Sequence, residues 1–289
     1  MAATILSDEV CELGEGPTYD PATDTLYWFD ILASRMLERK LSGGPTRIHQ
    51  LAQMASAIAT IDGERQLLLT ESGLHVRDAA TGKLTLHMSV EASNSATRSN
   101  DARVHPSGAL WFGTMGKKAE AGAGAIYWYF RGELRLLFPA ISIPNSICFS
   151  ADGKTAHYSD TALNLLYRLD CDPDTGLPLG EPKLFADRRG DKGDIDGSVV
   201  DRDGVLWNAS WGGGRVDAYA PDGKVIRSVA VPAMQATCPA FVGSAADRLV
   251  VTSATEGMNA RARRADPHAG KTFLLDIKVN GRHEPNILI

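Results

Sequence analysis

The chain of 289 residues repeats one short pattern six times, at intervals of about 40 to 50 residues. Each copy has a polar residue, an apolar segment, a turn with Asp or Gly, and a second apolar segment. The copies occupy residues 16–30, 56–70, 100–114, 145–160, 196–208 and 239–253. Each is typical of the two inner strands of a β-propeller blade, and a four-stranded blade needs about 40 to 50 residues. The repeat therefore predicts an all-β, six-bladed β-propeller, with residues 1–289 as a single domain and no appended module.

The turns between the apolar segments support this interpretation. Glycine tolerates the positive φ that tight hairpins need, and Asp-Gly is a strong hairpin signal. We expect such turns at Asp62-Gly63, Asp152-Gly153, Asp203-Gly204 and Asp222-Gly223. Trp28, Trp111 and Trp207 share one position in their repeats, which predicts packing between blades, whereas Trp211 is expected at a pocket rim.

Charge and composition argue against several functions. A net charge of −5 disfavours broad nucleic-acid binding, which needs a basic surface. No stretch approaches the roughly 20 apolar residues that span a bilayer, and the N-terminus lacks signal-peptide features, so we expect a cytoplasmic protein. The four cysteines lack metal-ligand or redox spacing and are expected to be buried. No obligate protein partner is evident.

Familiar catalytic motifs are absent from the sequence. The seven histidines are scattered singly, which disfavours a histidine-rich zinc site. There is no Gly-x-Ser-x-Gly elbow, phosphate-binding loop or dinucleotide fingerprint. Nucleotide cofactors are therefore not indicated.

Acids and amides recur at the start of successive repeats, namely at Glu15, Asn100 with Asp101, Asn145 and Asp196. In a propeller these positions converge at one mouth of the central channel. Oxygen ligands of this kind suit a hard divalent cation and leave positions for water and substrate. Each residue alone is also typical of an Asx turn, and spacing does not separate the two interpretations. Because these residues occupy the same position in successive repeats, a central metal site is favoured.

Motifs along nearly the whole chain resemble the gluconolactonase, regucalcin and senescence-marker-protein family, especially its bacterial sugar-lactone hydrolases. The motifs are Gly14-Glu-Gly-Pro17, Arg98-Ser-Asn-Asp101, Trp111-Phe-Gly-Thr-Met115, Pro144-Asn145, Tyr158-Ser-Asp-Thr161, Asp196-Gly197, Trp211-Gly-Gly-Gly-Arg215 and Val251-Thr-Ser-Ala254. The resemblance implies one divalent cation held by Glu15, Asn145 and Asp196. The oxygen ligands leave its identity open among calcium, zinc, manganese, magnesium and iron(II).

The resemblance also implies roles for residues around the metal. Arg98 matches a guanidinium that contacts the sugar ring, and Asn100 matches an amide near substrate or metal. Asp101 and Asp160 match supporting residues that orient the ligands.

The sequence departs from the family pattern at a few positions. Ser146 follows Asn145 where glycine is usual, and Val242 stands where glycine is usual in Phe241-Val-Gly243. Lys118 replaces an acidic substrate contact, and it either recognises a different hydroxyl pattern or lies in water. His105 replaces an aspartate in a turn and is expected to be structural.

We expect a metal-dependent hydrolase that opens a sugar-acid lactone to the aldonic acid. The cation would polarise the carbonyl, Asp196 would accept a proton from the attacking water, and Arg98, Asn100 and Lys118 would hold the sugar hydroxyls. One alternative is an esterase or phosphotriesterase on the same propeller, for which apolar pocket walls would be diagnostic. A calcium-binding propeller without turnover is the other, because a fold does not fix a function.

Overall fold

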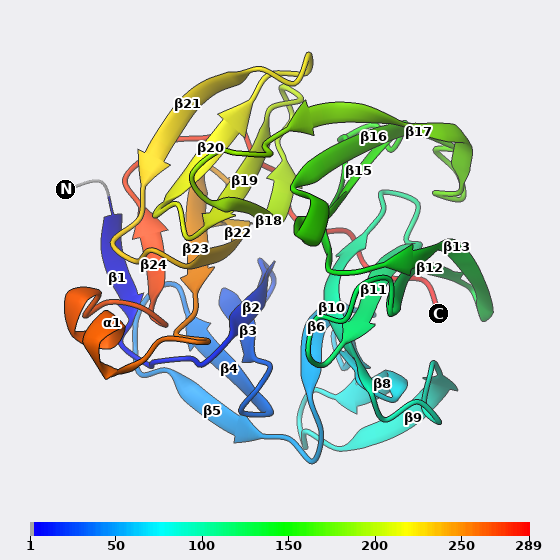
Figure 1. Ribbon diagram of the computed structural model, residues 1–289. Helices are drawn as coiled ribbons and strands as arrows, with labels where there is room; N and C mark the ends of the chain where they lie inside the picture. The colour runs from blue at the N-terminus through cyan, green and yellow to red at the C-terminus, as the bar shows by residue number, and fades with distance from the viewer. Residues whose placement is uncertain (1–2) are drawn as a thin grey trace.

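The computed structural model of the protein describes residues 3–289, which form six four-stranded antiparallel sheets around a central axis (Figure 1). This arrangement confirms the predicted all-β, six-bladed propeller. The six predicted repeats coincide with the first two strands of the six blades. The first strand of each blade lies innermost, and the strands that follow lie progressively farther from the axis.

The strands of the first three blades follow each other directly in the chain. Blade 1 contains β2 (Gly14–Asp20), β3 (Thr25–Asp30), β4 (Arg35–Lys40) and β5 (Arg47–Gln50). Blade 2 contains β6 (Ala55–Thr60), β7 (Arg65–Thr70), β8 (Gly73–Asp78) and β9 (Leu84–Ser89). Blade 3 contains β10 (Thr97–Val104), β11 (Leu110–Gly116), β12 (Gly124–Phe130) and β13 (Glu133–Ile141).

The last three blades complete the ring. Blade 4 contains β14 (Pro144–Phe149), β15 (Thr155–Asp160), β16 (Leu165–Cys171) and β17 (Pro178–Asp187). Blade 5 contains β18 (Asp194–Val200), β19 (Leu206–Trp211), β20 (Arg215–Tyr219) and β21 (Val225–Ala230). Blade 6 contains β22 (Ala236–Val242), β23 (Arg248–Ser253), β24 (Thr272–Leu275) and β1 (Ala3–Ser7). Two short helices, η1 (Thr161–Leu163) and α1 (Ala260–Ala265), lie in connections.

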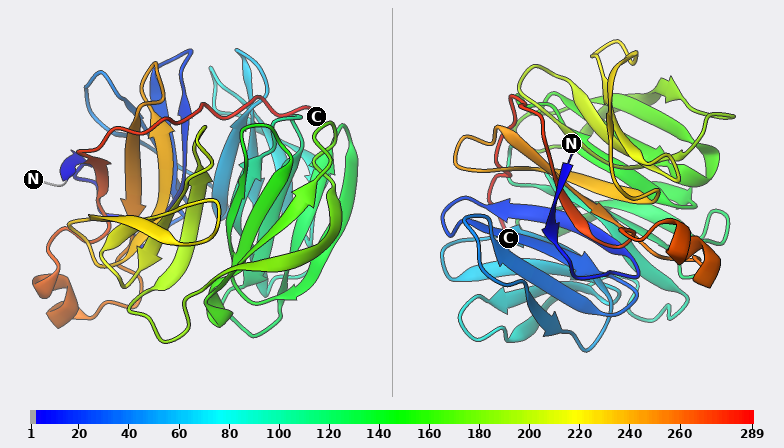
Figure 2. Two further views of the ribbon diagram at one scale, coloured as in Figure 1. Left: turned by 90° about the horizontal axis from the view of Figure 1, so that it is seen from above. Right: turned by 90° about the vertical axis from the view of Figure 1, so that its left-hand side faces the viewer.

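Both ends of the chain close the ring. The N-terminal strand β1 pairs with β24, so blade 6 combines strands from the two ends of the sequence. Residues 276–289, called the tail below, then run across one face of the propeller (Figure 2). Backbone hydrogen bonds of the tail reach blades 2, 3, 5 and 6, for example Ile287 N to Thr60 O at 2.8 Å and Arg202 N to Asn280 O at 2.8 Å. The tail is therefore a second closure, which the sequence analysis did not predict.

The second strand of each blade is almost wholly buried, because both of its faces pack against neighbouring blades. Trp28, Trp111 and Trp207 lie on these second strands and are at most 5% exposed, which confirms their predicted place in the core. All four cysteines are buried and free, as predicted. Apolar clusters of this kind join neighbouring blades, as with Trp207 of blade 5 and Phe273 of blade 6.

Around the axis the inner strands approach closely, and small residues allow this. Gly16 has φ of 57°, and a side chain there would collide with the carbonyl of Ser56 in blade 2. A side chain at Gly197 would likewise collide with Cys238 in blade 6. Glycine is thus required where two inner strands meet.

The Asp-Gly turns mostly follow the prediction. Gly153, Gly204 and Gly223 have φ of 70°, 77° and 84°. The predicted turn at Asp62-Gly63 does join β6 and β7, but Gly63 does not adopt the expected positive φ. There the Asp62 side chain itself makes the turn, accepting hydrogen bonds from Glu64 N at 2.9 Å and Arg65 N at 2.8 Å.

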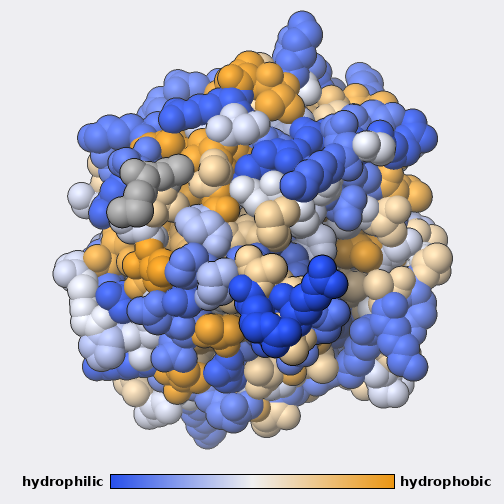
Figure 3. Space-filling view, turned by 60° about the vertical axis from the view of Figure 1, so that its left-hand side comes forward, coloured by the Kyte–Doolittle hydropathy of each residue, from blue (hydrophilic) through white to orange (hydrophobic). Residues whose placement is uncertain are grey.

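The surface is mixed in polarity. On the face in Figure 3, apolar residues lie in small groups that polar residues separate. The most exposed large apolar side chains, such as Leu184 and Ile226, belong to outermost strands, whose outer faces meet solvent. Within residues 3–289, none of the helices has the length and apolar character needed to cross a bilayer.

Candidate functional site

A cavity of about 480 Å³ lies at the end of the channel where the inner strands begin. We call it the site cavity. Every inner strand carries an irregularity in pairing near this end, for example between Glu15 and Thr18 in β2 and between Asn145 and Cys148 in β14. A β-bulge turns consecutive side chains away from the regular alternation and is common beside active sites. The repeated bulge therefore explains how strand residues come to face the channel.

All six residues predicted to bind metal or substrate line the site cavity. They are Glu15, Arg98, Asn100, Lys118, Asn145 and Asp196. All but Lys118 are buried, with exposed fractions of at most 8%. Lys118 is exposed at the rim, so both of its predicted interpretations stay open. The structure therefore brings together residues that are up to 181 positions apart in the sequence (196 − 15).

Three amide and guanidinium groups form a continuous chain of hydrogen bonds across blades 3 and 4. Arg98 Nη1 donates to Asn100 Oδ1 at 2.8 Å, and Asn100 Nδ2 donates to Asn145 Oδ1 at 3.0 Å. Asn145 Nδ2 donates to Thr161 Oγ1 at 2.9 Å, and Thr161 Oγ1 donates to the carbonyl of Ile195 at 2.7 Å. This chain fixes the oxygen of Asn145, which keeps a second lone pair for a ligand.

Burial and mutual repulsion dominate the electrostatics of the carboxylates. Burial, and then the charge of Asp101, raise the pKa of Glu15 to about 8. Burial, and then the charges of Glu15 and Asp101, raise the pKa of Asp196 well above its usual range. Neither carboxylate forms an ion pair with a described Lys, Arg or His side chain. Without a bound cation these carboxyl groups therefore tend to keep their protons, and a cation bound between them would favour their charged forms.

The donor set fits a divalent cation. Glu15, Asn145 and Asp196 offer carboxylate and amide oxygens, the ligand type that hard cations prefer. Within residues 3–289 no point gathers three or more His, Cys, Asp or Glu side chains in a metal-binding arrangement. The candidate set contains only two such residues and reaches three through Asn145. Such a set would leave coordination positions free for water and substrate.

Asp101 and Asp160 support the site from outside the cavity. Asp101 accepts hydrogen bonds from Ala102 N at 2.9 Å and from Ile147 N, in the neighbouring blade, at 2.8 Å. Asp160 accepts from Ser142 N at 2.9 Å and Ile143 N at 3.0 Å, directly before Asn145. Both carboxylates therefore anchor the strand that carries Asn145. 

Other residues of the cavity wall were not predicted as site residues. They include Thr161, Asn164, Asp194 and Glu256, whereas Trp211 lies at the cavity as expected. Most of these residues follow the second strand of a blade and lie in connections. The repeated pattern does not extend into the connections, so it did not mark these positions. Thr161 alone had a signal, because it ends a family motif. His105 lies elsewhere, buried against Phe149, with its Nε2 2.8 Å from Gly153 O, as expected for a structural residue.

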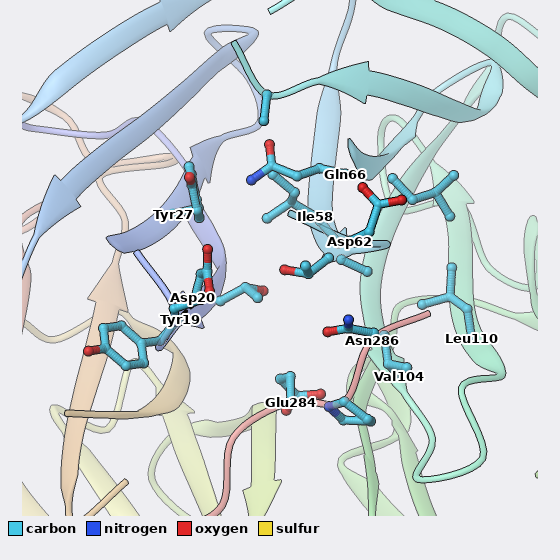
Figure 4. Close-up of a pocket in the computed structure, with 18 of the residues that line it drawn as sticks. Tyr19, Asp20, Tyr27, Ile58, Asp62, Gln66, Val104, Leu110, Glu284 and Asn286 are labelled. Carbon is cyan, nitrogen blue, oxygen red and sulfur yellow. Dashed lines mark hydrogen bonds between the residues drawn. The ribbon is translucent and has the colours of Figure 1, made fainter. Parts of the chain in front are cut away.

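A second cavity of about 240 Å³ lies near the opposite end of the inner strands, beside the tail (Figure 4). Its carboxylates already have partners. Asp20 accepts from Ala22 N at 2.9 Å, and Glu284 pairs with Arg103 at 3.4 Å. Asp62 also has a partner, because it accepts from the guanidinium of Arg65. Two of its three carboxylates are thus paired with arginines, and the third, Asp20, is only partly buried.

Comparison with known proteins places these features in a family. Residues 13–255 match the family described as SMP-30/Gluconolactonase/LRE-like region. A Rhizobium meliloti protein named "Putative sugar lactone lactonase" is 51% identical over 280 residues, which cover 97% of this chain and 95% of that protein. The L-arabinolactonase of Azospirillum brasilense is 36% identical over 286 residues, covering 96% of this chain and 93% of that protein.

A solved structure agrees with these sequence matches. The crystal structure of a calcium-binding protein, regucalcin, from Agrobacterium tumefaciens superimposes with a TM-score of 0.98 at 49% sequence identity. The match covers 100% of this chain and 98% of that chain. The predicted resemblance is confirmed, and the chain belongs to the SMP-30/gluconolactonase/LRE-like family.

Proposed function

We propose that the protein is a metal-dependent hydrolase that opens a sugar-acid lactone to the free aldonic acid. The observation that carries the proposal is the pair of buried, unpaired carboxylates Glu15 and Asp196 beside the fixed amide of Asn145. The names of the relatives support the substrate class, because they include an L-arabinolactonase and a pentonolactonase, at 36% and 31% identity.

Glu15, Asn145 and Asp196 would hold the cation through oxygen atoms. When bound, the cation supplies Lewis-acid polarisation of the lactone carbonyl, which contributes several kcal/mol in metal-dependent hydrolases. Its identity stays open among calcium, magnesium, manganese, iron(II) and zinc, since oxygen ligands accept all of them with preferences set by geometry. The regucalcin structure, described as calcium-binding, makes calcium the first cation to test.

Asp196 would act as the general base. Its carboxylate would accept a proton from the water that attacks the carbonyl carbon. As the bond between that carbon and the ring oxygen breaks, Asp196 would return the proton to the ring oxygen. The products balance as one carboxylic acid and one hydroxyl on the opened chain.

Substrate binding would involve Arg98, Asn100 and Lys118. Arg98 Nη1 is held by Ser99 O at 2.9 Å and by Asn100 Oδ1, so the guanidinium has a fixed plane from which to donate to hydroxyls. Asn100 Nδ2 donates to Pro144 O at 2.9 Å and to Asn145 Oδ1. Asn100 would therefore act by holding Arg98 and Asn145 in place. Lys118 would reach hydroxyls from the rim.

The test is hydrolysis of a panel of aldono-1,4- and 1,5-lactones by chelator-stripped protein, with each divalent cation added in turn. Rates are corrected for spontaneous opening. Turnover that depends on an added cation would support the proposal and would rank both metal and sugar. Hydrolysis of phosphotriesters or simple esters, with no lactone opened, would replace it with the esterase alternative.

The description of the regucalcin structure as calcium-binding favours one second candidate, a calcium-binding propeller without turnover. Calorimetric titration of the stripped protein with calcium separates the two. Stoichiometric binding without hydrolysis of any ester on the panel would favour this candidate. Calcium binding and hydrolysis need the same oxygen ligands, but only hydrolysis needs a general base.

A further inference from the structure

Glu256 is a cavity residue with a fixed backbone. It follows β23 in the connection to α1, and hydrogen bonds to backbone atoms hold this connection. Thr255 N donates to Glu12 O at 2.9 Å, and Gln235 Nε2 donates to Glu256 O at 3.0 Å. The residue before them, Ala254, forms an isolated bridge with Leu13 in the connection to blade 1. These bonds hold the backbone at Glu256 beside the site cavity.

The side chain of Glu256 faces the site cavity together with Arg98. It is half-buried, and burial raises the pKa of its carboxyl group, whereas the charge of Arg98 lowers it. Glu256 is also the carboxylate with the largest charge effect on Arg98, ahead of Glu15 and Asp196. The two side chains thus influence each other across the cavity.

Arg98 and Glu256 nevertheless make no direct polar contact. The structure describes both side chains and contains no ion pair between them. Arg98 uses only Nη1 for hydrogen bonds within the chain, and its Nε is buried without a partner. Nη2 of Arg98 makes no hydrogen bond within residues 3–289, so a donor of Arg98 and the carboxylate of Glu256 belong to side chains that line one cavity without bonding to each other.

A sugar hydroxyl can fill such a gap, because it accepts one hydrogen bond and donates another. We propose that Glu256 is a specificity-determining residue that accepts a hydrogen bond from a ring hydroxyl of the lactone, while Arg98 donates to the same hydroxyl or to its neighbour. This inference rests on the proposed lactonase function. The acceptor would select polyhydroxylated lactones over bare ones, since a lactone without that hydroxyl leaves a half-buried carboxylate unpaired.

The test compares Glu256→Ala with Glu12→Ala on two substrates. Glu12 is the matched control, because it is an exposed glutamate close enough to affect Glu256 and outside the cavity wall. The substrates are the best aldonolactone from the panel and γ-butyrolactone, which has no ring hydroxyl. For Glu256→Ala, we expect KM for the aldonolactone to rise about 10- to 100-fold, with kcat changed less than about 3-fold. We expect kcat/KM for γ-butyrolactone to stay within about 2-fold of wild type, as no hydroxyl contact is lost.

Each outcome bears on the inference. A smaller rise in KM for Glu256→Gln, whose amide oxygen still accepts, would support a direct hydroxyl contact. An equal loss of kcat/KM on both lactones would overturn it, because that pattern indicates a general effect on the site. An equal effect of Glu12→Ala would overturn it too, since the cause would be net charge. If the wild-type protein hydrolyses neither lactone with any cation, the proposed function itself is wrong and this inference falls with it.

Discussion

The two ends of the central channel contain the same types of side chain but differ in how charge is balanced. At the tail end, Glu284 pairs with Arg103, which lies deep in the channel and is 5% exposed. Arg103 also donates to the carbonyl of Ser198 at 3.4 Å. At the other end, Glu15 and Asp196 are equally buried and have no cationic partner among the described residues.

The difference shows where the fold carries function and where it carries stability. Burying a charge without a partner costs free energy, so a site that keeps two such carboxylates is less stable than a neutral one. The paired end binds the tail across the propeller and helps to close it. Carboxylates without a cationic partner are expected where a cation and a substrate must bind, because residues that serve binding are often not those that maximise stability.

The largest expected effect comes from removing a carboxylate at the site cavity. Asp196→Ala should lower kcat by at least roughly 10³-fold, because it removes both a proposed ligand and the proposed general base. It should not lower the free energy of unfolding of the metal-free protein, since it relieves repulsion with Glu15. Kinetics with saturating cation, together with urea unfolding, measure both quantities.

A matched control exists at the opposite end. Asp20→Ala removes a carboxylate that only caps the β2–β3 turn and binds Thr23 Oγ1 at 2.7 Å. It should leave kcat unchanged. Retained activity in Asp196→Ala, or a comparable loss in Asp20→Ala, would contradict the assignment of the base.

The next effect should appear at the paired end. Glu284→Ala removes the ion-pair partner of the buried Arg103, which we expect to lower the free energy of unfolding by roughly 3 kcal/mol. The kcat of the folded enzyme should stay within about 2-fold of wild type, because Glu284 does not line the site cavity. Denaturant unfolding and steady-state kinetics on the same preparation test the two statements.

The double variant Arg103→Met/Glu284→Gln sharpens this result. Removing both charges should recover part of the lost stability, because neither charge of the pair is left unpartnered, although Asp101 then loses the favourable charge of Arg103. If the double variant were as unstable as Glu284→Ala, the cost would come from lost packing in the channel and not from an unpaired charge.

The sequence predicted one end of the channel much better than the other. The sequence repeat identified Glu15, Asn145 and Asp196 because each lies at the beginning of an inner strand. In a propeller, the beginnings of the inner strands lie together at one end of the channel. The tail has no repeat, and several of its contacts are backbone hydrogen bonds, which leave no side-chain pattern to read. Glu256 was missed for a related reason, since it lies in a connection, where its carbonyl accepts from Gln235 and the neighbouring Thr255 N donates to Glu12 O.

A buried histidine outside the central channel extends the comparison. It tests whether a buried ionisable group without a partner also lowers stability inside a blade. His157 in β15 packs edge-on against Phe185, and its Nδ1 is buried without a partner. Burial, and then the charge of Arg168, lower the pKa of His157 to about 3, from about 6.5 when unfolded. Since the unfolded chain binds the proton more readily, the His157 contribution to stability is lost as the pH falls from about 6.5 toward 3.

Between pH 7 and pH 5 this effect should reduce the free energy of unfolding by about 2 kcal/mol. His157→Phe should remove that part of the pH dependence while keeping an aromatic contact with Phe185. Urea unfolding of both proteins at the two pH values measures it. Equal losses in wild type and variant would show that the acid sensitivity arises from other groups.

The smallest effect concerns the backbone beside the candidate metal ligand Asn145. Ser146 has φ of 55°, a left-handed conformation that costs a non-glycine residue about 1 kcal/mol. Its hydroxyl donates to the carbonyl of Asp196 at 2.5 Å, which links blades 4 and 5 at the site cavity. Ser146→Gly and Ser146→Ala both lose that bond, so their difference isolates the backbone strain. We expect the glycine variant to be more stable than the alanine variant by about 1 kcal/mol in denaturant unfolding. Equal stability would mean that the bulge relaxes at this position, and the serine would then be retained for its hydrogen bond alone.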